Sequence, residues 1–149
     1  MDNTPGVSLF PFTMEAYEEV LQLWRVCEGI GLSDADSREN VARYLERNPG
    51  LSYIAAADRK VVGAILGGHD GRRGLLHHLA VHPSHRRRGI GRILAQRSLD
   101  ALQNAGIGKC HGMVFKNNTE ALAFWQSLGW VVREDVCLIS KSLGQAQAE

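Results

Sequence analysis

One stretch, HHLAVHPSHRRRGIGRIL at residues 77–94, constrains the fold more than any other part of the sequence. A strand-like segment leads through a proline and three arginines into Gly89-Ile90-Gly91, after which apolar residues recur with a helical period. Because the first N–H groups of a helix have no partner within the helix, they face any anion that approaches this turn. The sequence therefore predicts an anion-binding turn between a strand and a helix.

The turn fits neither of two common phosphate-binding motifs. A P-loop requires GxxxxGK followed by Ser or Thr, and residues 106–110 (GIGKC) have neither the spacing nor the hydroxyl. A dinucleotide fingerprint requires GxGxxG, but Leu94 stands where the third glycine belongs. The two glycines still let an anion approach the backbone closely. Positive charge around it would come from Arg86, Arg87, Arg88 and Arg92.

Charge and cysteine content limit the class of protein. The chain has 149 residues with 17 Lys+Arg against 16 Asp+Glu, so the arginine run is a local feature and no nucleic-acid partner is expected. Cys27, Cys110 and Cys137 are odd in number and form no CxxC, which argues against a disulfide framework or zinc site and favours a reducing cytoplasm. Without a signal-like or membrane-spanning segment, we expect residues 1–149 to form one soluble cytoplasmic domain.

Apolar periodicity and breaker residues predict the order of the elements. We expect strands at 7–12, 51–57, 60–68, 75–81, 109–115, 130–132 and 136–139, and helices after Thr13, at 37–47, from Ile90 to Gly106 and at 117–128. Segments 51–57 and 60–68 are expected to pair as a hairpin. This order predicts an α+β (α/β) fold with a mixed sheet.

Two motifs resemble those of a known family. Arg86-Arg87-Arg88-Gly89-Ile90-Gly91 matches the R/Q-x-x-G-x-G/A signature of the GNAT superfamily of acyl-CoA-dependent N-acyltransferases. Asn118-x-x-Ala121-x-x-x-Trp125-x-x-x-Gly129-Trp130 resembles its second signature, and the segment ending at residues 79–83 (LAVHP) resembles its fourth strand. The element order matches over nearly the whole chain. GGHDGRRG before that strand is most similar to the YpeA-type bacterial branch.

The resemblance implies a GNAT fold, with a mixed, mostly antiparallel central sheet splayed at strands 4 and 5 and flanked by four helices. It implies acetyl-CoA (coenzyme A) as cosubstrate, with the pyrophosphate on the arginine turn. Leu79 and Val81 would pair with the pantetheine arm, and Asn118 would touch it. Both Asn117 and Asn118 are natural caps for the following helix, and Asn117, which forms a capping-box-like pair with Glu120, is expected to be mainly structural. The implied cofactor-binding residues are Leu79, Ala80, Val81, Arg86, Arg87, Arg88, Gly89, Ile90, Gly91, Arg92, Asn118, Ala121 and Trp125.

The same resemblance implies direct acetyl transfer to a primary amine of a small molecule or protein, with no covalent enzyme intermediate. His77 occupies a position that holds glutamate in many members, so it is a candidate general base, and a partly buried structural histidine is the alternative. The backbone N–H of Leu79 would face the thioester oxygen. Strand alternation places His77 and Leu79 on one face and His78 on the other. Trp125 replaces a tyrosine that protonates the leaving thiolate, which would leave water as the proton source.

Other polar residues carry weaker predictions. Asp70 and Arg73 are candidate substrate residues, although Asp-Gly favours a hairpin turn by itself. Four histidines lie between residues 77 and 85, but adjacent strand residues point apart and HExxH is absent, so no metal is expected. Carboxylates expected to be solvated loop or cap residues, with attraction of a cationic acceptor as the alternative, are Glu28, Asp34, Asp36 and Glu39.

Three functions remain open at this stage. An N-acetyltransferase is favoured, a catalytically weak acyl-CoA-binding regulator or sensor is the main alternative, and a nucleotide- or RNA-binding protein is the third. The near-neutral charge argues against the third. We expect no membrane partner and either a monomer or a homodimer.

Overall fold

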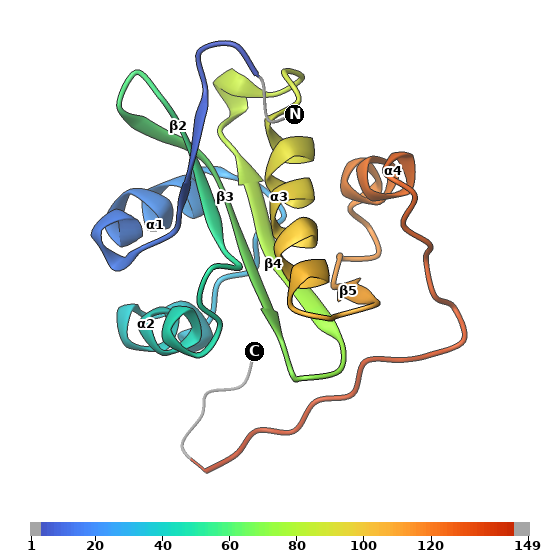
Figure 1. Ribbon diagram of the computed structural model, residues 1–149. Helices are drawn as coiled ribbons and strands as arrows, with labels where there is room; N and C mark the ends of the chain where they lie inside the picture. The colour runs from blue at the N-terminus through green and yellow to red at the C-terminus, as the bar shows by residue number, and fades with distance from the viewer. Residues whose placement is uncertain (1–3, 145–149) are drawn as a thin grey trace.

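The computed structural model describes residues 4–144, which build one five-stranded sheet flanked by helices (Figure 1). The strands follow one another across the sheet in chain order: β1 (Ser8–Pro11), β2 (Tyr53–Ala57), β3 (Lys60–His69), β4 (Gly74–Val81) and β5 (Cys110–Gly112). The first three pairings are antiparallel, and β4 pairs with β5 in parallel. The predicted mixed, mostly antiparallel sheet is confirmed.

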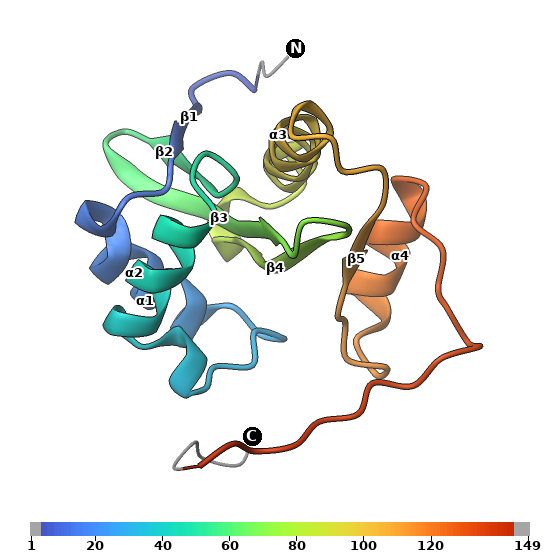
Figure 2. The same ribbon diagram turned by 60° about the horizontal axis from the view of Figure 1, so that its bottom comes forward.

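Within residues 4–144, four α-helices flank the sheet, as predicted. Helices α1 (Tyr17–Val26) and α2 (Arg38–Arg47) cover one face, and α3 (Ile90–Asn104) covers the other, while α4 (Thr119–Ser127) lies beside β5 (Figure 2). Short 3-10 turns at Met14–Ala16, Asp34–Asp36 and Pro83–His85 precede α1, α2 and the arginine turn. In residues 4–144 no helix is both long and apolar enough to cross a membrane.

The sheet separates two apolar cores because its central strand is covered on both faces. Every residue of β3 from 62 to 68 is buried, which explains the unbroken apolar run in the sequence. Val20 and Trp24 of α1 pack against Ala64 on one face. Ile90 and Leu94 of α3 pack against Ile65 on the other.

Helix starts differ in part from the sequence prediction. Ser37 caps α2, its hydroxyl accepting the Asn40 N–H at 3.2 Å. Asn118, and not Asn117, caps α4, because the Ala121 N–H donates to its Oδ1 at 3.1 Å. The sequence offered both asparagines as caps, and the structure uses Asn118; only the preference for Asn117 was wrong.

The end of the chain also differs from the prediction. β5 stops at Gly112, short of the predicted 115, and in the part of the chain that the structure describes no strand forms at 130–132 or 136–139. These segments have the apolar, β-branched composition of strands, but a strand needs a partner edge, and residues 131–144 are exposed instead.

Gly67 lies so close to the backbone of Leu51 that a side chain at this position should destabilise the fold. A Cβ on Gly67 would lie 2.4 Å from the carbonyl oxygen of Leu51, so Gly67→Ala forces the backbone apart. We expect it to lower the free energy of unfolding by about 2 kcal/mol or more, measured by urea denaturation. The matched control is Gly108→Ala, because nothing lies within 4 Å of the added Cβ there. Equal free energies of unfolding for the two variants would contradict the close contact between Gly67 and the Leu51 backbone.

Candidate active site

A β-bulge in the middle of β4 decides where the predicted site residues point. Leu66 of β3 lies opposite His77 and Ala64 lies opposite Ala80, so His78 and Leu79 together face the single residue Ile65. His78 has the left-handed backbone conformation, with φ +49°, which occurs in one class of bulge and which a regular strand does not allow.

The bulge overturns the predicted alternation of side chains. His77 contacts the Tyr44 ring of α2, with centroids 6.0 Å apart, and His78 contacts the Trp24 ring of α1 at 5.1 Å. Both histidines therefore lie on the α1–α2 face, and their rings are 6.4 Å apart. Leu79 packs into the core on the α3 side. The prediction that His77 and Leu79 share a face opposite His78 was wrong, because the extra residue shifts the alternation by one.

The surroundings of His77 keep its imidazole neutral. Burial lowers the pKa of His77 below its ordinary value of 6.5, the neighbouring His78 lowers it further, and Asp36 opposes the shift. The neutral ring, which can accept a proton, therefore predominates at neutral pH.

His78 holds the connection between α1 and α2 against the sheet. Its Nε2 lies 2.9 Å from Oδ1 of Asp36, whose carboxylate is almost fully buried. The Ser33 N–H donates to the other carboxylate oxygen at 3.1 Å, and the Tyr17 hydroxyl donates to the Asp36 carbonyl at 2.7 Å. The expectation that Asp36 is a solvated residue was wrong. Its signal in the sequence was the capping-box spacing from Ser33 to Asp36.

Strands β4 and β5 pair over only part of the length of β4. Pairing runs from Gly74 opposite Cys110 to Leu76 opposite Gly112 and then ends. Within residues 4–144, the segment 77–81 of β4 has no strand beside it on that edge. This is the splay expected between the fourth and fifth strands, and it leaves this part of β4 without strand pairing on that edge, where the Val81 carbonyl accepts from side chains instead.

The α1–α2 connection reaches across to the far side of this splay. A Cβ on Gly29 would lie 2.5 Å from Nδ2 of Asn118, and one on Gly31 would lie 3.0 Å from the Phe115 ring. Larger residues at these two positions would collide with the segment between β5 and α4. The loop that His78 and Asp36 anchor therefore borders both sides of the splay.

At the end of β4, the arginine turn leads into an uncapped helix. Arg87 and Gly89 adopt left-handed conformations, with φ +64° and +82°, and α3 begins at Ile90. In the described chain no side chain caps this helix, so its first-turn N–H groups lack a side-chain acceptor, and the arginines on either side of its start are exposed. Arg86 lies apart from them, because its Nε donates to the Val81 carbonyl at 3.1 Å.

Gly91 lies where β4, α3 and α4 meet. A Cβ at this position would be 3.3 Å from the Phe124 ring and 3.7 Å from a methyl carbon of Leu79. A side chain here would fill the approach from the helix N-terminus to the open edge of β4. The arrangement therefore connects the predicted anion turn with the predicted strand edge.

Helix α4 carries the remaining predicted cofactor residues. Asn118 caps its N-terminus, and Ala121 and Trp125 are partly buried along it. The Trp125 ring packs edge-on against Trp130 at 4.7 Å and Phe124 at 5.2 Å. Trp125 also contacts the core on the α3 side, so it forms part of the apolar packing of α4.

Cys27 is buried and Cys110 is half-buried, and both thiols are protonated at neutral pH. Burial raises the pKa of Cys27, and it raises the pKa of Cys110 to about 11. The Cys27 thiol donates weakly to the Val81 carbonyl at 3.5 Å. Neither group is a nucleophile at neutral pH, because the thiolate is the reactive form.

Hydrogen bonds within the β3–β4 hairpin explain why Asp70 occurs at this position without invoking a ligand. Its Oδ1 accepts the N–H groups of Arg72 at 2.8 Å and Arg73 at 2.9 Å, and these backbone hydrogen bonds lower its pKa. The hairpin lies at the opposite end of β4 from the arginine turn. A role for Asp70 and Arg73 toward the acceptor stays a prediction. The described residues include no group of three or more His, Cys, Asp or Glu placed to hold a metal ion.

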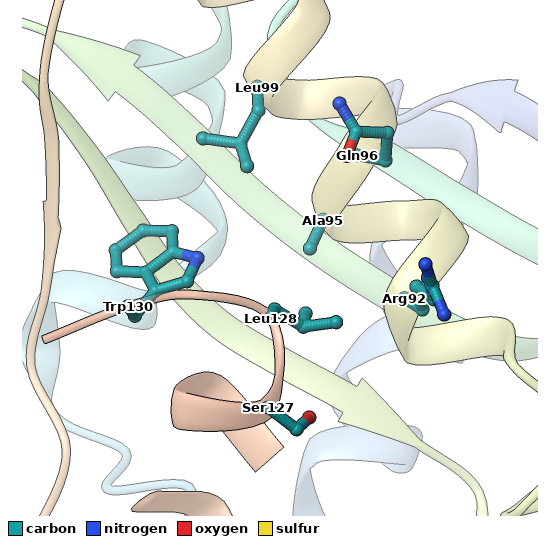
Figure 3. A pocket seen from close by; sticks show the side chains of 7 residues that line it. All are labelled: Arg92, Ala95, Gln96, Leu99, Ser127, Leu128 and Trp130. Carbon is teal, nitrogen blue, oxygen red and sulfur yellow. The ribbon is translucent and has the colours of Figure 1, made fainter.

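A small pocket of about 170 Å³ lies between α3 and the end of α4 (Figure 3). It lies on the α3 side of the sheet, whereas His77 lies on the α1–α2 side, and it shares Arg92 with the anion turn. Its lining residues are Arg92, Ala95, Gln96, Leu99, Ser127, Leu128 and Trp130.

Comparison with known proteins agrees with this geometry. Residues 17–130 match the Acetyltransferase (GNAT) family, to which the chain therefore belongs. An acetyltransferase of Sodalis glossinidius (strain morsitans) is 33% identical over 91% of this chain and 95% of its own length. An acetyltransferase of Yersinia pestis (strain Pestoides F) is 30% identical over 85% of this chain and 89% of its own. Membership of the YpeA-type branch stays a prediction.

Solved structures share the fold at lower identity. Ard1 of Thermoplasma volcanium superimposes with a TM-score of 0.77 at 19% identity, over 86% of this chain and 84% of that one. The PaiA N-acetyltransferase of Thermoplasma acidophilum, solved with coenzyme A, gives 0.75 at 19% identity, over 87% and 92%.

The Asp36 contacts predict a further stability effect. Asp36→Ala removes the partner of His78 and of the Ser33 N–H in a buried setting, so we expect the free energy of unfolding to fall by about 2–4 kcal/mol. Asp34→Ala is the control, because that side chain is exposed in the same 3-10 turn. The measurement is urea denaturation of both variants. A loss no larger than that of the control would show that the buried pair contributes nothing.

Proposed function

We propose that this protein is an N-acetyltransferase that moves an acetyl group from acetyl-CoA directly to a primary amine of a small molecule or a protein. One observation carries the proposal: the uncapped, arginine-flanked N-terminus of α3 meets the unpaired edge of β4 at Gly91. Membership of the family supports it. So do structural neighbours solved with coenzyme A and with a coenzyme A bisubstrate analogue.

The residues present fit coenzyme A. The N–H groups at the start of α3, together with Arg87, Arg88 and Arg92, would hold its pyrophosphate. The open edge of β4 at residues 79–81 would hydrogen-bond the pantetheine amides through the backbone. Asn118, Ala121 and Trp125 would form the opposite side. When bound, acetyl-CoA supplies an activated thioester.

His77 is the candidate general base. Its neutral ring accepts the proton of the acceptor ammonium, directly or through water, and the lowered pKa keeps it able to do so at neutral pH. The Leu79 N–H donates to the carbonyl oxygen as negative charge develops there. Trp125 has no acidic proton, so water protonates the thiolate, which leaves readily because an ordinary thiol has a pKa of about 8.5.

The second candidate is a catalytically weak acyl-CoA-binding regulator. Trp125 favours it, since this position lacks the tyrosine that the family uses as an acid.

Structural neighbours include an aminoglycoside acetyltransferase solved with sisomicin and the ribosomal-protein-S18-alanine N-acetyltransferase of Escherichia coli. The deciding experiment is free-thiol release from acetyl-CoA with a panel of small amines and peptide N-termini. Binding of acetyl-CoA without turnover on any amine would favour the regulator.

Gly91 provides the test of cofactor binding. Gly91→Asp places a carboxylate where the phosphates approach α3, so we expect loss of acetyl-CoA binding by calorimetry. Gly108→Asp introduces the same charge at an open position and should bind as the parent does. Circular dichroism checks that both variants fold. Parent-like affinity in a folded Gly91→Asp protein would exclude this turn as the pyrophosphate site.

His77 provides the test of catalysis. We expect His77→Ala to lower kcat/KM by about 100-fold or more, the scale of a lost general base. In the parent, activity should fall as pH drops through a pKa below 6.5, because protonated His77 accepts no proton. The activity of His77→Ala should not show this fall at low pH. His69→Ala, at the far end of β3, is the histidine control. Equal rates for His77→Ala and the parent at pH 6 and pH 8 would assign proton removal to solvent.

A further inference from the structure

Three exposed apolar side chains lie around the splay between β4 and β5. Leu32 belongs to the α1–α2 connection, and Met113 and Phe115 directly follow β5. They are 39%, 54% and 57% exposed, although these residue types are usually buried. We call these three residues the apolar border. Apolar side chains gathered at the surface beside a site indicate an area that a ligand covers.

Backbone geometry places the apolar border on one side of the sheet. A Cβ on Gly112 would lie 3.7 Å from the Trp130 ring, which packs with the α3-side core. Because side chains alternate along an extended chain, Met113 points to the opposite side, toward α1 and α2. Phe115 faces the same way, since its ring lies 3.0 Å from a Cβ built on Gly31 of the α1–α2 connection (Figure 2). The apolar border therefore lies on the α1–α2 side.

His77 lies on the same side, where the splay begins. The last pair of β4 and β5 joins Leu76 to Gly112, so His77 and Met113 are the first residues beyond it on the two chains. The His77 ring contacts the Tyr44 ring of α2, whereas Leu79 packs on the α3 side. An amine that gives its proton to His77 therefore approaches past the apolar border, from the side opposite α3.

The segments around this approach are poor in charge. Asp, Glu, Lys and Arg are all missing from residues 29–33 (GIGLS), 75–81 (LLHHLAV) and 111–115 (HGMVF). Glu28 and Asp34 stand just outside the first segment and are exposed, and Asp36 is buried and bonded to His78. A bound polycation needs carboxylates to replace the water around each of its charges. These segments offer apolar contact instead.

We propose that the acceptor is a primary amine attached to an aromatic or branched aliphatic group, which packs on the apolar border while the amine reaches His77. This inference rests on the proposed function and names its acceptor class. The amine nitrogen bonds the acetyl carbon and the carbon–sulfur bond breaks. The two protons that the ammonium loses pass to His77 and, through water, to the thiolate. An apolar lining with a few polar groups is typical of small-ligand sites.

The first test compares acceptors with the parent protein. Free-thiol release from acetyl-CoA is measured with 2-phenylethylamine, ethylamine and spermidine. We expect kcat/KM for 2-phenylethylamine to exceed that for each of the other two by about 10-fold or more, the scale of one apolar group in a binding site. A peptide that begins with phenylalanine, compared with the same peptide beginning with glycine, distinguishes a protein acceptor of this chemistry from a small molecule.

The outcomes separate this inference from the proposed function. No thiol release with any of these amines or peptides would overturn both. Release that is as fast with ethylamine or spermidine as with 2-phenylethylamine, and as fast with the glycine peptide as with the phenylalanine peptide, would overturn this inference alone and leave the acetyltransferase in place.

The second test assigns the preference to the apolar border. Phe115→Ala should lower the ratio of kcat/KM for 2-phenylethylamine to kcat/KM for ethylamine by about 10-fold, because ethylamine has no group that reaches the ring. The matched control is Phe10→Ala, which removes a phenylalanine that is 50% exposed on β1, at the opposite edge of the sheet, and should keep the parent ratio.

Leu32→Ala is the second variant, because Phe115→Ala also removes a contact with Gly31. We expect it to lower the same ratio without removing that contact. Circular dichroism checks that each variant folds. A ratio that neither Phe115→Ala nor Leu32→Ala lowers below that of Phe10→Ala would refute the role of the apolar border in acceptor choice.

Discussion

The bulge at His78 and Leu79 is the constraint on which the site depends. A left-handed residue with a side chain costs about 1–2 kcal/mol, so it persists only where its surroundings require it. Here the ring of His78 contacts Trp24 and bonds Asp36. The bulge thereby ties β4 to the α1–α2 connection and turns His77 toward the same face, where burial and His78 keep it neutral.

The site combines two kinds of interaction that different parts of the fold supply. The start of α3 offers backbone N–H groups and arginines, an electrostatic surface that needs little precision. The β4 edge offers directional backbone groups, which exist only because β5 stops pairing after Gly112. Gly91 connects the two, since the absence of a Cβ leaves the approach between Leu79 and Phe124 open.

Sequence reasoning located the turn, the order of the elements up to α4 and the position of His77 on β4. It failed where a contact between distant residues decides the outcome. Asp36 looked like a surface carboxylate because its partner His78 is 42 residues away. The bulge was missed because alternation assumes equal residue numbers on paired strands, and nothing local to His78 marks the extra residue. The last two strands were predicted from composition, which says nothing about whether a partner edge is within reach.

The sequence by itself determined the features that depend on near neighbours. Strand, turn and helix around residues 77–94 follow from periodicity, glycine and charge, and the first GNAT signature lies within that local pattern. Only the tertiary structure decided which histidine faces which helix, which carboxylate is buried and where β5 ends. Those outcomes depend on pairing register and on contacts between residues far apart in the chain, and the free energy of such contacts is set by the packed arrangement and not by residue type alone.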